Sequence, residues 1–166
     1  MFKIVNTMNE NTAHVLDTLL TYQTRRFQDL MAEILQCCKQ RTAFLSDKYW
    51  IPEAELRCLQ LFSGERYLTA KGITQRLEVA KSRVTKIIDG MIQKGLVETI
   101  DDPKDARIKL IALTPEGQKK AEEIGALTRE LHEHVLLEFD PEQRKNVLAC
   151  LEMLRASMEA VKKQLV

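Results

Sequence analysis

The most informative stretch of the sequence for predicting the fold is residues 80–117, which read AKSRVTKIIDGMIQKGLVETIDDPKDARIKLIALTPEG. The first part of this stretch repeats apolar residues at helical spacing, which predicts one amphipathic helix from about Ala80 to Lys94. Its expected apolar side consists of Val84, Ile87, Ile88, Met91 and Ile92. The pair Lys94-Gly95 ends it, since a glycine easily adopts the left-handed conformation that follows a helix.

The periodicity changes after Gly95. Residues 96–100 and 108–113 are rich in β-branched and apolar residues, which predicts two short strands. The polar turn 101–107 between them contains Pro103 and predicts a β-hairpin. Thr114-Pro115-Glu116 then gives a cap, a proline and an acid, the pattern that starts a helix.

Two further helices are expected before this stretch. Pro52-Glu53 starts one, and Thr69 caps a shorter one that ends at Leu77. A helix, a short helix, a turn, a cationic helix and a hairpin together make a winged helix-turn-helix. The sequence therefore predicts a mainly α fold with a short β-hairpin wing.

Charge is concentrated in the same region. The whole chain has a net charge of +1, but residues 66–95 hold seven cations and two anions, a net charge of +5. A basic segment on a near-neutral scaffold is typical of a module that binds a polyanion. The major groove of B-DNA, about 12 Å wide, admits one helix that offers hydrogen-bond donors. The candidate DNA-binding residues are Lys81, Ser82, Arg83, Thr85 and Lys86 on the helix, with Lys104 and Arg107 at the hairpin tip.

Long amphipathic helices are expected at both ends of the chain. One runs from Asn11 or Thr12 to about residues 44–47, and two follow Pro115 and Pro141. The last helix has a seam with alternating spacings of four and three, which suits a partner helix or packing within the chain. Its residues are Val147, Leu151, Leu154, Met158, Val161 and Leu165. We expect these N- and C-terminal helices to form a dimerisation bundle, with region boundaries at 1–50, 51–114 and 115–166.

Other classes of protein lack support in the sequence. Apolar runs are too short for a membrane span, and the start has no signal-peptide pattern. The cysteines, Cys37, Cys38, Cys58 and Cys150, show no pairing or metal-binding spacing, so we expect reduced thiols in a cytoplasmic protein without a metal or cofactor. No Gly-rich phosphate loop or nucleophile motif is found, and the chain is not expected to be an enzyme.

Residues Thr69 to Glu123 resemble the MarR (multiple antibiotic resistance regulator) family of transcription factors. The resemblance is carried by VTK at 84–86, KGLV at 94–97, DPKDAR at 102–107 and LTPEG at 113–117. It implies a homodimer that binds a pseudo-palindromic operator in double-stranded DNA, usually as a repressor released by a small molecule or an oxidant. By position, Ser82, Arg83, Thr85 and Lys86 would read the major groove. Arg107 would be the wing arginine, steadied by Asp105.

Each of these assignments has an alternative. Arg83 and Lys86 could form only a solvated helix face, and the winged helix could bind a protein partner instead of DNA. Oxidant sensing by Cys37, Cys38 or Cys58 competes with an ordinary role as small apolar side chains. Salt-dependent binding to duplex DNA separates the two main functions, because only the DNA-binding function requires it.

Overall fold

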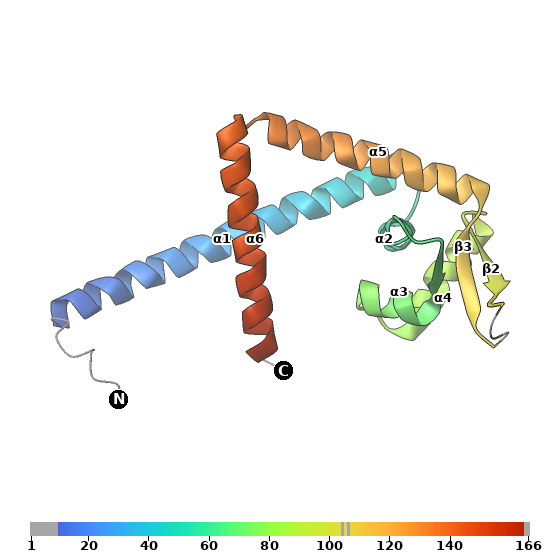
Figure 1. The fold of residues 1–166 in the computed structure, drawn as a ribbon, viewed down its shortest axis with the longest axis horizontal. Coiled ribbons are helices and arrows are strands. Elements are labelled where there is room, and N and C mark those ends of the chain that lie inside the picture. Colours follow the sequence, from blue (N-terminus) through green and yellow to red (C-terminus); the bar gives the residue numbers. More distant parts are fainter. Residues whose placement is uncertain (1–9, 104, 106, 165–166) are drawn as a thin grey trace. The chain divides into compact units, whose positions relative to one another are not determined.

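The computed structural model describes residues 10–103, 105 and 107–164 of the chain. The chain divides into two compact units, and the border between them falls inside α2, after Leu56. The predicted boundaries at residues 50 and 114 stay a prediction. The elements, all but β1 labelled in Figure 1, are α1 (Glu10–Tyr49), α2 (Glu53–Gln60), β1 (Tyr67–Thr69), α3 (Ala70–Leu77), α4 (Lys81–Gln93), β2 (Val97–Asp101), β3 (Lys109–Leu113), α5 (Pro115–Leu137) and α6 (Pro141–Gln164).

The first unit contains α1, which is 40 residues long and extends beyond both of its predicted ends. Trp50 follows it in the left-handed conformation, with φ 55°. The amide of Ile51 then donates to the carbonyl of Ser46 over 3.1 Å, which closes the end of the helix. Much of the apolar side of α1 remains exposed in the single chain. Its exposed residues include Leu19, Leu20, Phe27, Leu30, Ile34 and Leu35.

The second unit contains a three-stranded antiparallel sheet in the order β1-β3-β2. The predicted hairpin is present as β2 and β3, in which Thr99 lies opposite Ile111. The strand β1 was not predicted, because three residues are too few to show an alternating pattern. Its central residue, Leu68, is buried and pairs with Ile111 from the other side.

The helices α3 and α4 pack against each other, and α4 also contacts β2. Val84, Ile87 and Met91 are buried on one side of α4, as predicted. The prediction was wrong for Ile92, whose residue is 42% exposed. Ile92 lies about 100° around the helix from Met91, so it falls outside the buried arc.

The caps of the other helices follow the sequence closely. The Thr69 hydroxyl accepts from the amide of Gly72 over 3.0 Å at the start of α3. At the start of α6, Asp140 accepts from the amide of Gln143 over 2.9 Å, and the Gln143 side chain accepts from the amide of Asp140 over 3.0 Å. These reciprocal bonds form a capping box.

The terminal apolar faces are only partly covered. On α5, Ile124 is buried, whereas Val135 is 59% exposed. On α6 no described residue is buried. Leu165, at the end of the predicted seam, lies outside the described residues. The described residues of the α6 seam are therefore all at least partly exposed.

Candidate nucleic-acid interface

The structure places all five predicted residues of α4 on its exposed side. Val84 and Ile87 turn into the core, while the intervening positions remain open to solvent. The spacing of α4 therefore separates an apolar side that fixes the helix from a polar side that can meet a ligand. The exposed residues of the prediction are Lys81, Ser82, Arg83, Thr85 and Lys86.

The N-terminal end of α4 favours an anion. Ala80 caps the helix without a side-chain hydrogen bond, and its carbonyl accepts from the amide of Arg83 over 2.9 Å. The first turn of α4 contains no acidic residue. The positive end of the helix dipole is thus uncompensated by a carboxylate from that turn, and Lys81 and Arg83 add to it.

A turn of fixed shape joins α3 to α4. Glu78 follows Leu77 in the left-handed conformation, with φ 53° and ψ 42°. Sequence reasoning missed this role, because glycine or asparagine is the usual residue there. Arg76, in the last turn of α3, pairs with Glu65 at 2.7 Å and so holds the preceding loop against that helix.

The wing is closed at its base. Asp101 and Lys109 lie opposite each other in the register of β2 and β3, and their side chains form an ion pair. Beyond this pair, the amide of Ile108 donates to the carbonyl of Asp105 over 2.9 Å. Lys104, a predicted DNA-binding residue, lies outside the described residues, as does Ala106.

The wing tip is shaped by Asp105. Its carboxylate accepts from the backbone amide of Arg107 over 3.0 Å, and both residues are exposed. Such a short-range bond from an aspartate to the amide two residues later stabilises a tight turn. Asp105 therefore positions the backbone of Arg107, and the guanidinium group lies on the surface of the wing.

A close junction connects the end of α4 to the start of α5. The Thr114 hydroxyl accepts from the amide of Gly117 over 3.0 Å and donates to the carbonyl of Gly95. Gly117 packs so tightly that an added Cβ would lie 1.8 Å from the carbonyl oxygen of Leu96. The sequence predicted only the helix start here. The glycine in the first turn of α5 was the one signal of close packing.

The cysteines differ in their exposure to solvent. Cys37 and Cys38 are exposed on α1, whereas Cys58 on α2 is only 1% exposed. Within the described ranges, no three His, Cys, Asp or Glu side chains gather closely enough to hold a metal ion. None of the described helices is long and apolar enough to cross a membrane.

Comparison with known proteins identifies the region that contains this interface. Residues 51–108 match the model of the MarR family. Transcriptional regulator AdcR of Streptococcus pneumoniae is 34% identical over 94 residues, which is 55% of this chain and 64% of AdcR. HTH-type transcriptional repressor MdtR of Bacillus subtilis is 31% identical over 100 residues, which is 60% of this chain and 59% of MdtR. The match thus spans about three fifths of either relative.

A solved structure extends the likeness in fold. A MarR family protein from Bacillus stearothermophilus is 27% identical, with a TM-score of 0.68 over 92% of this chain and 99% of that one. The winged helix-turn-helix predicted from the sequence is therefore confirmed. The names of the two curated relatives describe regulators, in agreement with the expectation that the chain is not an enzyme. Residues 51–108 are therefore similar to the MarR family, and the chain resembles a solved MarR family protein in fold.

Proposed function

We propose that this chain is a sequence-specific DNA-binding transcriptional regulator that acts in the cytoplasm as a homodimeric repressor. The observation that carries the proposal is the division of α4 into a buried apolar side and an exposed side with three cations. Those cations are Lys81, Arg83 and Lys86. The relatives named as a transcriptional regulator and an HTH-type transcriptional repressor support it.

Two parts of the surface would contact the DNA. In this proposal α4 enters the major groove, where Ser82, Arg83, Thr85 and Lys86 meet base edges and Lys81 meets phosphate. The wing reaches the adjacent minor groove or backbone through Arg107 and Lys104. Asp105 supports the wing, because its bond to the Arg107 amide limits how far the turn can flex.

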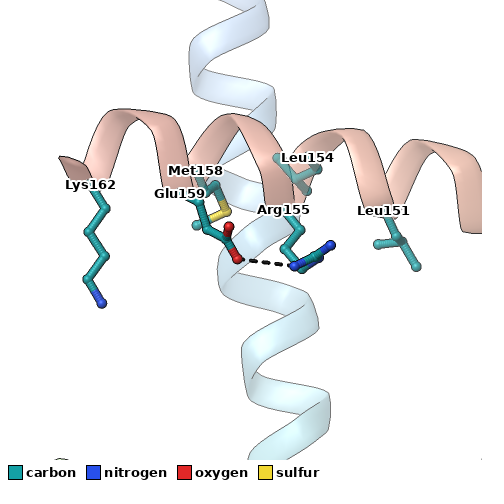
Figure 2. A pocket seen from close by; sticks show the side chains of 6 residues that line it. All are labelled: Leu151, Leu154, Arg155, Met158, Glu159 and Lys162. Carbon is teal, nitrogen blue, oxygen red and sulfur yellow. Dashed lines mark hydrogen bonds and ion pairs between the residues drawn. The ribbon is translucent and has the colours of Figure 1, made fainter. Parts of the chain in front are cut away.

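The dimer would use the terminal helices. Figure 2 shows Leu151, Leu154 and Met158 on successive turns of α6, beside the ion pair of Arg155 and Glu159 at 3.2 Å. Leu151 and Met158 are 52% and 50% exposed, respectively. Burying these apolar groups against a second copy would remove them from water. A two-fold axis would place two copies of α4 on half-sites about 10 bp apart in a pseudo-palindromic operator.

Release from DNA would need a signal. We propose a small-molecule effector, with an oxidant acting on Cys37 or Cys38 as the second candidate because both thiols are exposed. The buried Cys58 is less accessible to an oxidant. Replacing each of these cysteines with serine and repeating DNA binding with and without peroxide separates the two signals. If peroxide weakens DNA binding by the wild type but not by one variant, the thiol replaced in that variant is the sensor. If peroxide leaves DNA binding unchanged in the wild type and in every variant, the small-molecule effector is favoured.

The experiment that tests the function starts from a random pool of duplexes. The protein should enrich a sequence with two related half-sites, because a two-fold dimer presents the same helix twice. Enrichment of no sequence, together with binding that does not depend on salt, would contradict the proposal. That result would favour the alternative in which the winged helix binds a protein partner.

A further inference from the structure

Thr85 occupies the second turn of α4, on its exposed side. Its hydroxyl donates to the carbonyl of Lys81 one turn earlier, over 3.2 Å. A threonine hydroxyl has a single proton to donate. In this arrangement the proton is used within the helix itself.

This bond limits what Thr85 can offer to a base. The hydroxyl oxygen keeps its acceptor capacity, but the side chain has no second proton for an acceptor such as N7 or O6 of guanine. The remaining group on the same carbon is a methyl. In the major groove the matching apolar group is the C5-methyl of thymine, which the other three bases lack.

We propose that Thr85 reads one thymine in each half-site through contact between its methyl group and the thymine C5-methyl. The inference rests on the proposed DNA-binding function and names a specificity-determining residue for it. Neighbouring positions carry the polar contacts: Ser82 lies one turn before Thr85, and Lys86 follows it. Thr85 therefore selects a base by shape and hydrophobicity where its neighbours select by hydrogen bonding.

The test uses the duplex enriched from the random pool. Each thymine is replaced in turn by uracil, which removes only the C5-methyl and keeps every hydrogen-bonding group. Wild-type protein should lose affinity at one thymine of each half-site, by about fourfold per half-site, the factor that burying one methyl-sized group gives. Uracil at the other positions should change affinity by much less.

Two variants of Thr85 make the assignment specific. Thr85→Val keeps a methyl group and removes the hydroxyl. The thymine-to-uracil ratio, which is the affinity for the thymine duplex divided by the affinity for the uracil duplex, should therefore persist. Thr85→Ser keeps the hydroxyl and removes the methyl, so the ratio should fall to about one. Both variants are measured on the same pair of duplexes, which cancels any effect of uracil on the DNA alone. Circular dichroism confirms that each variant has the helix content of the wild type.

The results also separate this inference from the function on which it rests. Specific binding of the enriched duplex without any thymine-to-uracil difference would overturn the role of Thr85 and leave the function standing. A ratio kept in Thr85→Ser and lost in Thr85→Val would overturn it too, because the hydroxyl would then make the contact. Absence of sequence-specific binding would overturn the proposed function, and this inference with it.

Discussion

Individual residues on α4 and α5 have separable tasks in this molecule. The exposed cations of α4 face solvent because Val84, Ile87 and Met91 fix the opposite side in the core. Gly117, in contrast, is buried and serves packing, since its lack of a side chain lets the backbone of Leu96 approach. Changes at these two kinds of position should therefore affect different measurements, namely DNA binding and stability.

Arg83→Ala should remove a base contact. We expect a loss of about 1–3 kcal/mol on the enriched duplex and little change on a scrambled one, because a base contact contributes only to the specific site. Fluorescence anisotropy with both duplexes measures the difference. Arg129→Ala, which removes an exposed arginine from α5, is the matched control. Equal losses on the two duplexes would mean that Arg83 contacts phosphate instead of a base.

Gly117→Ala should destabilise the fold. The new Cβ would lie 1.8 Å from the Leu96 carbonyl oxygen, so backbone must move. We expect a net loss of about 1–3 kcal/mol in the free energy of unfolding, measured by denaturant titration. Gly125→Ala on the same helix is the control, because nothing lies within 4 Å of its added Cβ. That substitution should stabilise by about 0.5–1 kcal/mol through helix propensity. Two variants of equal stability would contradict the close junction.

At the scale of elements, the sequence predicts what local chemistry determines. The caps at Thr69 and Thr114 satisfy backbone amides of their own helices, so residue type and spacing were sufficient to find them. The strand β1 was missed because it is held by pairing with β3, more than 40 residues later in the chain. Ile92 was misplaced because a run of apolar letters does not define how wide the buried arc is.

The candidate interface shows the same limit. Helical periodicity was enough to predict that Arg83 and Lys86 are exposed on α4. Periodicity could not show that the Thr85 hydroxyl donates to the Lys81 carbonyl, because that depends on a side-chain rotamer. Nor could it show that Asp105 steadies Arg107 through a bond from the backbone amide of Arg107 to the Asp105 carboxylate.

The wing as an element should contribute charge more than sequence selection. Arg107→Ala should weaken binding to the enriched and scrambled duplexes alike, and should flatten the salt dependence by about 0.9 for each phosphate that is no longer neutralised. Arg107→Lys keeps the positive charge and should keep the slope. Titrations at several salt concentrations measure both. An unchanged slope in Arg107→Ala would show that the wing arginine does not approach the phosphates.

The whole molecule is expected to be complete only as a dimer. No described residue of α6 is buried, and we propose that a second copy covers its apolar seam. The sequence left the partner of this seam open between another helix of the chain and a second subunit. The choice between them depends on tertiary contacts, which spacing within one helix does not contain.

Leu151→Asp should disrupt that dimer without unfolding the subunit. Leu151 is 52% exposed in the single chain, so a carboxylate there stays solvated until a second copy buries it. Sedimentation should show dissociation of the variant at micromolar concentration, where we expect the wild type to be a dimer. Met153→Asp is the matched control, because Met153 is 67% exposed on α6 but lies off the seam. A wild-type monomer, or equal behaviour of both variants, would contradict dimerisation through this seam.

In the proposed function, the exposed side of α4 binds duplex DNA electrostatically and reads its sequence. Titrating the wild-type protein with the enriched and scrambled duplexes at salt concentrations from about 50 to 200 mM measures both properties together. If about six to ten phosphates are neutralised, affinity should fall by roughly 10³- to 10⁵-fold over this range, with the enriched duplex bound more tightly throughout. Binding that is weak, independent of salt and equal for both duplexes would contradict this role of α4.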